Sequence, residues 1–588
     1  MTTDLSEAST GAEPEAGEPA EAPARSGRAV LAVLLVAVNV PIVVATVRAL
    51  ANGWQPVGDN GILLVRARDV GTSHHPLLGS WTSASLSVGE NVNNPGPVYS
   101  DLLAPWVRLL GPWVGLAVGV MLVNMASSTL AVVVARRVAG LESMLAVGVV
   151  VVGLQFAMGS ELLFDVWQPN ALLLPFLAFL VVAAALACGD RAMLPWAVGV
   201  GSLLVQTHLS YAVLVAVLGA AALALGIRAR RGRPADGSWR TPVLWAVGLA
   251  AVLWTQSLIE QFTGTGEGNL GRIAGASGGG DADPIGWGRG VRLMIEIMVR
   301  GPWFTRAGFD EAVPPTAPDA DLYAVVTAAT ALLAVATAAV ALVAIGVVAA
   351  RRGRRDLATM AAIGGLSVAT AYVALATAPV NVIEIAVHQM RWLWPVAAFV
   401  SAVVLTALFA ALTAWAPART AVLVAGAVVV VVVAAVNLPT HRSRASGPVD
   451  EAGSRQAAVD LVSQLGALEG RGPILFVSDL AFAEPFSGLV FAEMQDRGIP
   501  FVFDDDVFVR QFGEGRRDDG DARLRMWEVT GPAAALEIEG AERVAYAEGG
   551  PWEQVALFVA PVDADIELPY IAPGAEVAPP GADGAAPG

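Results

Sequence analysis

Ionisable side chains follow directly after the first long apolar segment of the chain. The motif "GDNGILLVRARDV" contains Asp59, Arg66, Arg68 and Asp69. A carboxylate can take a proton, and the planar guanidinium of Arg can bind an oxyanion through two parallel hydrogen bonds. Charged groups within or beside membrane-crossing segments are costly and usually mark a functional site. This motif is therefore the first candidate for chemistry.

Further polar and ionisable side chains lie next to other apolar segments of the chain. In "VIEIAVHQMRW", Glu384, His388 and Arg391 share one face of a helix. Asn94 lies further along the first loop, and His208 separates two apolar segments. The other polar residues beside the apolar segments are His74, His75, Glu90, Asn93, Asp101, Glu161, Asp165, Gln168, Gln206, Gln256 and Glu260. Four of the five histidines fall in this set, which is the best functional signal in the sequence.

Polar residues at the ends of membrane helices also have ordinary interfacial roles. The residues that fit such a role are Asp69, Asp101, Glu161, Asp165 and Gln256. The pair His74-His75 resembles part of a zinc site, but no third ligand has a diagnostic spacing. Both the functional and the ordinary interpretation therefore remain open for these residues.

The composition predicts that these residues are carried by membrane helices. The chain has 588 residues, of which 55% are hydrophobic and 15% charged, with a mean hydropathy of +0.60. Soluble domains rarely combine these values. About 20 apolar residues cross the hydrocarbon core. The predicted spans are 28–51, 111–135, 142–159, 170–188, 192–207, 209–227, 241–262, 321–349, 357–378, 392–415 and 419–438.

Arginine-rich loops predict the orientation of these spans. All 36 basic residues are Arg. With eleven spans, Arg136-Arg137, Arg191, the stretch 228–240, the stretch 351–355 and Arg419 all fall on one side. Basic loops face the cytoplasm. The N-terminus is therefore predicted to be cytoplasmic, and the loops 52–110 and 263–320 and the C-terminus extracytoplasmic, in a bacterial plasma membrane.

The segments outside the bundle differ in composition. Residues 1–26 are predicted to be a disordered cytoplasmic tail, 27–440 the transmembrane domain, and 568–588 a disordered tail. Residues 441–567 are predicted to form a small extracytoplasmic α/β domain, because strand-like and helix-like segments alternate there. Helices are expected at 453–468 and 480–497. Strands are expected at 473–479, 500–505, 523–530 and 554–561. The net charge of −16 and the absence of a basic stripe argue against nucleic-acid binding.

The first loop resembles that of the GT-C superfamily of polytopic membrane glycosyltransferases. In that family a catalytic acid follows the first span, and a Pro-rich turn leads to a "Y-x-x-L" helix before the second. Asp59 matches the acid, although Asn60 stands where a second acid is usual. "NNPGPVYSDLLAPWVRLLGP" (93–112) matches the turn, with Asn94 in place of a His. The resemblance covers roughly residues 28–440, and only the first loop is specific.

This resemblance implies a GT-C-like bundle that moves a sugar from a polyprenyl-phosphate donor to an envelope glycan, lipid or protein. Such a transfer needs a base for the acceptor hydroxyl and a cation for the leaving phosphate. Asp59 is the candidate base and Arg391 the candidate cation, with Arg66 or Arg68 in reserve. The other candidate substrate-binding residues are His388, His208, Asp69, Asn94 and Glu384.

Two other functions stay open from the sequence. The missing second acid and the missing His fit a non-catalytic envelope assembly or scaffold protein with a GT-C-like fold. A secondary transporter fits less well, because its polar groups would lie at the bilayer midplane in two similar halves. No metal site is predicted from the residues, although a divalent metal remains an alternative for the family.

Overall fold

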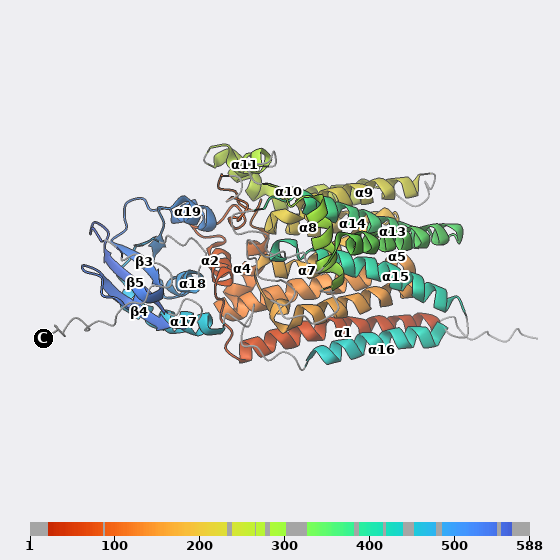
Figure 1. Cartoon of the computed structure of the whole chain (residues 1–588), viewed down its shortest axis with the longest axis horizontal. Helices are drawn as coiled ribbons and strands as arrows, with labels where there is room; N and C mark the ends of the chain where they lie inside the picture. The colour runs from red at the N-terminus through yellow and green to blue at the C-terminus, as the bar shows by residue number, and fades with distance from the viewer. Residues whose placement is uncertain are drawn as a thin grey trace, which may run out of the picture.

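A helical bundle and a smaller α/β domain lie end to end in the structure, a computed structural model (Figure 1). It describes residues 22–85, 89–231, 238–264, 266–276, 283–300, 326–380, 387–415, 419–438, 452–477, 485–549, 554–566 and 568. Most of both predicted tails, and Glu384, lie outside these residues. The first helix begins at Ala22, inside the segment expected to be a tail.

The bundle consists of long apolar helices. Within the described ranges, nine helices are long and apolar enough to cross a membrane. The chain is therefore a multi-pass membrane protein. The helices of the bundle are α1 (Ala22–Ala51), α5 (Pro112–Phe164), α7 (Leu173–Ala187), α8 (Leu194–Thr207), α9 (Ala212–Arg230), α10 (Arg240–Thr263), α13 (Ala328–Arg351), α14 (Arg355–Thr377), α15 (Leu393–Thr413) and α16 (Arg419–Asn437). Every residue of the central helix α7 is buried.

Two local breaks account for the predicted segments 111–135 and 142–159 and for the segments on either side of His208. Helix α5 is interrupted at Ala139 and Gly140. Its two halves lie side by side, since the Asn124 amide donates to the Leu163 carbonyl at 2.9 Å. Helix α8 ends before His208, whose backbone is extended. With 14 residues, α8 is only about 21 Å long and does not span the hydrocarbon core by itself.

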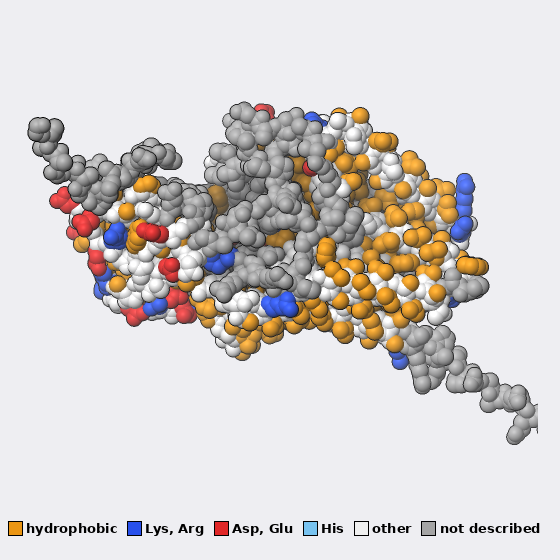
Figure 2. Space-filling model, turned by 60° about the horizontal axis from the view of Figure 1, so that its bottom comes forward, with side chains coloured by type: hydrophobic (Ala, Val, Ile, Leu, Met, Phe, Trp, Pro, Cys, Tyr) orange, Lys and Arg blue, Asp and Glu red, His pale blue; other side chains and the backbone are white. Residues whose placement is uncertain are grey.

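On the face that Figure 2 shows, the described surface of the bundle is mostly apolar, and charged side chains lie toward its two ends. Such a surface suits lipid, because apolar side chains face the hydrocarbon and a helix pairs its backbone polar groups internally. Short helices gather at the end that carries the α/β domain. They are α2 (Asp59–Asp69), α4 (Val98–Leu110), α6 (Gln168–Ala171), α11 (Gly268–Ala276), α12 (Trp287–Ile295) and the π-helix η4 (Glu296–Arg300).

The α/β domain is built on a five-stranded sheet of order β2-β1-β3-β5-β4. Strand β1 is parallel to β2 and β3, whereas β5 is antiparallel to β3 and β4. The strands are β1 (Ile474–Val477), β2 (Phe501–Val502), β3 (Leu524–Thr530), β4 (Glu542–Glu548) and β5 (Gln554–Pro561). The helices are α17 (Ala452–Ser463), α18 (Ser487–Asp496) and α19 (Asp506–Phe512). The predicted α/β class is confirmed, and β4 and α19 are additions that the sequence analysis missed.

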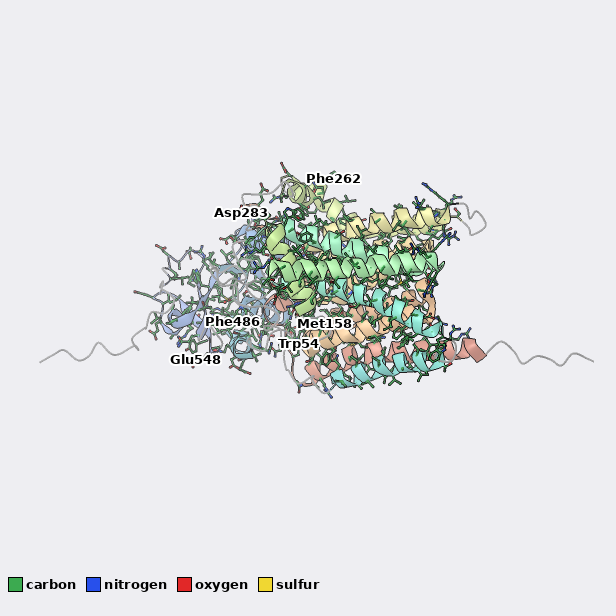
Figure 3. All side chains as sticks on the ribbon, turned by 45° about the vertical axis from the view of Figure 1, so that its right-hand side comes forward. Trp54, Met158, Phe262, Asp283, Phe486 and Glu548 are labelled. Atoms are coloured by element: carbon green, nitrogen blue, oxygen red, sulfur yellow. The ribbon has the colours of Figure 1, made fainter. Side chains whose placement is uncertain are left out.

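The two parts meet through a continuous apolar core. Helices α18 and α19 lie between the sheet and the bundle (Figure 1). At the junction, Trp54 and Met158 of the bundle and Phe486 of the α/β domain are buried (Figure 3). Trp54 also contacts Phe164 edge to face, with ring centroids 6.0 Å apart. The junction thus supports α2, the helix that begins with Asp59.

Candidate functional site

The turn that carries Asp59 is held in one conformation by its backbone. Gly58 has φ 59°, a left-handed conformation that favours glycine. Its N–H donates to the carbonyl of Pro485 in the α/β domain at 2.9 Å. Asp59 then begins α2, and its side chain is exposed. An acidic residue in the first turn of a helix is stabilised by the positive end of the helix dipole.

A chain of hydrogen bonds leads from this turn into the bundle. The Asn60 amide donates to Asp165 Oδ1 at 3.0 Å. The Asn170 amide donates to Asp165 Oδ2 at 2.6 Å. Asn170 in turn accepts a hydrogen bond from the Arg391 guanidinium. The first loop, the α5–α6 connection and the start of α15 therefore meet at one place.

The electrostatics of this place depend on burial. Asp165 is 2% exposed and Arg391 is 1% exposed. Burial raises the pKa of Asp165, while the hydrogen bonds from Asn170 and Asn60 and the charge of Arg391 oppose that shift. The Arg391 guanidinium also lies over the Trp394 ring, 5.5 Å from its centroid. A cation held in this way can act on a nearby anion with little screening by water.

His208 and Asn94 lie on a neighbouring side of this cluster. The rings of His208 and Tyr211 pack edge to face, with their centroids 6.2 Å apart. Tyr211 also interacts electrostatically with Arg391. Burial lowers the pKa of His208 to about 4, so its imidazole is neutral near pH 7. The Asn94 side chain accepts from the backbone N–H of Leu209 at 2.8 Å. Asn94 therefore fixes the helix break next to His208.

Arg66 and Asp69 face the α/β domain instead. Arg66 donates to the carbonyls of Gln511 and Leu78, and burial lowers its pKa to about 10. Asp69 accepts two hydrogen bonds from Arg516, both at 2.8 Å, and a third from Gln495. Both side chains are thus engaged in the contact between domains.

His75 belongs to a separate polar chain. Its Nδ1 accepts from the N–H of Gly71 at 2.7 Å, so Nε2 carries the proton toward Gln256 Oε1 at 2.8 Å. The Gln256 amide then donates to Asp101 Oδ2 at 2.7 Å, and burial raises the pKa of Asp101. Gln256 is therefore a bridge between the first loop and α10 rather than an isolated interfacial group.

The remaining candidates are described only in part. The backbone of His388 lies in η5 (Val387–Met390), which packs against α6. In the described part of the chain, no three His, Cys, Asp or Glu side chains are grouped so that they could hold a metal ion.

Sequence reasoning did not select the two residues that join the site. The sequence analysis leaves both a functional and an interfacial role open for Asp165 without selecting it as a site residue, and it does not include Asn170. The available signal was the polar stretch "DVWQPN" (165–170) between two apolar helices.

Two ion pairs of α2 provide a prediction about the contact between domains. The Asp69–Arg516 pair is 2% and 5% exposed, whereas the Arg68–Asp496 pair is 24% and 44% exposed. Removing one partner of a buried pair leaves an uncompensated charge. Asp69→Ala is expected to lower the free energy of unfolding by about 3–5 kcal/mol. Asp496→Ala is expected to cost about 1 kcal/mol or less. Denaturant titration of both variants would contradict this ranking if their losses were equal.

Fold and site together describe a multi-pass helical membrane protein whose polar residues converge at the end that carries an α/β domain. No model of a known protein family matches the chain, and no curated protein matches its sequence. Its structure is similar to that of ArnT from Cupriavidus metallidurans bound to undecaprenyl phosphate. The similarity covers 92% of this chain and 98% of that chain, with 13% sequence identity and a TM-score of 0.46.

Proposed function

We propose that this protein is a GT-C-type membrane glycosyltransferase that moves a sugar from a polyprenyl-phosphate donor to an extracytoplasmic envelope acceptor. The proposal rests on a chain of hydrogen bonds. It runs from Asn60, the neighbour of Asp59, through Asp165 and Asn170 to Arg391. An exposed carboxylate and a buried guanidinium from distant parts of the sequence thus flank one cluster.

These residues suit the two ends of the reaction. Asp59 takes the proton of the acceptor hydroxyl, whose oxygen attacks the anomeric carbon of the sugar. The bond between that carbon and the phosphate oxygen breaks, and polyprenyl phosphate leaves with an additional negative charge. Arg391 stabilises that charge through its guanidinium. Because Arg391 is 1% exposed, donor binding requires the surrounding chain to open.

The test is turnover by the unmodified, full-length protein. Purified protein in lipid nanodiscs is mixed with a panel of polyprenyl-phosphate sugars and candidate envelope acceptors. The expected result is donor-dependent appearance of glycosylated acceptor together with free polyprenyl phosphate. Donor binding without release of polyprenyl phosphate from any member of the panel would contradict an enzymatic function.

A non-catalytic assembly or scaffold protein is the second candidate. The observation that favours it is the use of Arg66 and Asp69 in internal contacts with the α/β domain. These two residues are then parts of the architecture and not ligands of a substrate. In the same assay, a scaffold would bind an envelope component and leave the donor intact.

The proposed orientation gives a separate prediction. The candidate site and the α/β domain share one end of the bundle, whereas the exposed Arg351 ends α13 and the exposed Arg352 lies in the turn between α13 and α14. A reporter that is active only outside the cytoplasm is expected to work when fused after residue 445 and to fail after Arg352. The reverse pattern would place the site on the cytoplasmic face, away from an extracytoplasmic acceptor.

A further inference from the structure

Helices α2 and α18 pack side by side along their whole length. The contacts between them begin with Gly58–Pro485 and Gly61–Gly488 and end with Arg68–Asp496 and Asp69–Gln495. The residue numbers of both helices increase from one pair to the next, so the helices are parallel. Their N-terminal ends therefore meet beside Asp59.

The N-terminal end of this contact permits no side chain. A Cβ atom added to Gly61 would overlap the carbonyl group of Gly488, and one added to Gly488 would overlap the carbonyl oxygen of Gly58. These obstacles are backbone atoms, so a rotamer change in a side chain cannot relieve them. The two backbones can approach this closely only because both positions are glycine.

The C-terminal end of the contact is fixed by charge. Arg516 holds Asp69 through two hydrogen bonds and stacks over the Phe501 ring, 4.0 Å from its centroid. Gln495 of α18 donates to the same carboxylate at 2.7 Å. The α/β domain thus contacts α2 at both ends, while the Asn60 side chain in the first turn of α2 donates to Asp165 of the bundle.

We propose that Gly488 and Arg516 are positioning residues for the turn that carries Asp59. The α/β domain is then a working part of the candidate site and not a separate binding module. This inference rests on the proposed function, because Asp59 is taken as the base. Its physical basis is that α2 contacts both the bundle and the domain, so a shift of α18 moves Asp59 relative to Arg391.

The first arm of the test needs no substrate. Hydrogen exchange of residues 58–69 is measured in the full chain in nanodiscs for the unmodified protein, Gly488→Ala and Arg516→Lys. Gly365→Ala is the control, because a Cβ added to Gly365 meets no atom. In both test variants, we expect the amides of α2 to exchange faster than in the unmodified protein. In the control variant, we expect their exchange rate to be unchanged. Arg516→Lys keeps the positive charge. If Gly488→Ala does not fold, the exchange of α2 in Arg516→Lys alone tests the inference. Unchanged α2 exchange in the folded variants overturns the inference.

The second arm separates positioning from simple stability. A misplacement of about 1 Å at a reacting group can cost about 100-fold in rate. Gly488→Ala is therefore expected to lower kcat by about 10- to 100-fold with little change in the donor KM, since Arg391 and the bundle still hold the donor. Full kcat with a loosened α2 overturns the positioning role. If the unmodified protein transfers no sugar, the proposed function fails on that result, and exchange of α2 still decides whether the domain holds this helix.

Discussion

Replacing Asp59 with Asn is expected to reduce kcat for sugar transfer by about 100- to 10,000-fold, the usual effect of losing a positioned base. The amide keeps the size of the side chain and most of its hydrogen bonding, but it cannot take the acceptor proton. Donor affinity should change far less, because Asp59 is assigned to the acceptor side. The measurement is steady-state transfer together with donor binding for the same preparation.

The matched control for this substitution is Asp519→Asn. Asp519 is exposed in a loop of the α/β domain, and its side chain accepts a hydrogen bond from the N–H of Asp521 in the same loop. It tests whether loss of one external carboxylate affects activity in general. Full turnover in Asp59→Asn would end the assignment of this residue as the base, whatever the control shows.

Replacing Arg391 with Lys is expected to act mainly on donor affinity, whereas Asp59→Asn acts mainly on kcat. Lys keeps the positive charge but offers a point charge in place of a planar fork, so it loses the hydrogen bond to Asn170 and the parallel bonds to phosphate. Donor affinity is expected to fall by about tenfold or more, in line with the loss of one charge-assisted hydrogen bond of about 1.5–3 kcal/mol. Binding of polyprenyl phosphate, measured by native mass spectrometry, provides the readout.

The same substitution at the other end of the bundle is the control. Arg351 is exposed at the end of α13, and Arg351→Lys should leave donor affinity unchanged. If both substitutions weaken binding equally, the effect comes from a general attraction between arginines and anionic lipid. Arg391 would then lose its specific role.

The architecture was predictable because each element leaves a local pattern. Long apolar runs indicate the membrane helices, and His208 interrupts one of them where α8 ends. The α/β domain also leaves a pattern, because β1 and most of β5 are continuous apolar segments. Strand β4 was missed because "ERVAYAE" begins and ends with charged residues and is exposed at both ends. Its place in the sheet depends on pairing with β5.

The site was predictable only in part, because its contacts are tertiary. Arg391 and the turn of Asp59 were selected as polar groups at one end of the bundle, and the structure joins them through Asp165 and Asn170. No local pattern pairs Asp165 with a residue 105 positions earlier. Likewise, Asp69 reads as a free carboxylate in the sequence, but Arg516 of another domain neutralises it.

An experimental structure of the full-length protein with a bound polyprenyl-phosphate sugar tests the central claim most directly. The measured quantity is the position of the phosphate and of the anomeric carbon relative to the side chains. The predicted result places the phosphate within hydrogen-bonding distance of the Arg391 guanidinium and the sugar between it and Asp59. A phosphate bound at the arginine-rich opposite end, or a sugar that cannot reach Asp59, would contradict the proposed site.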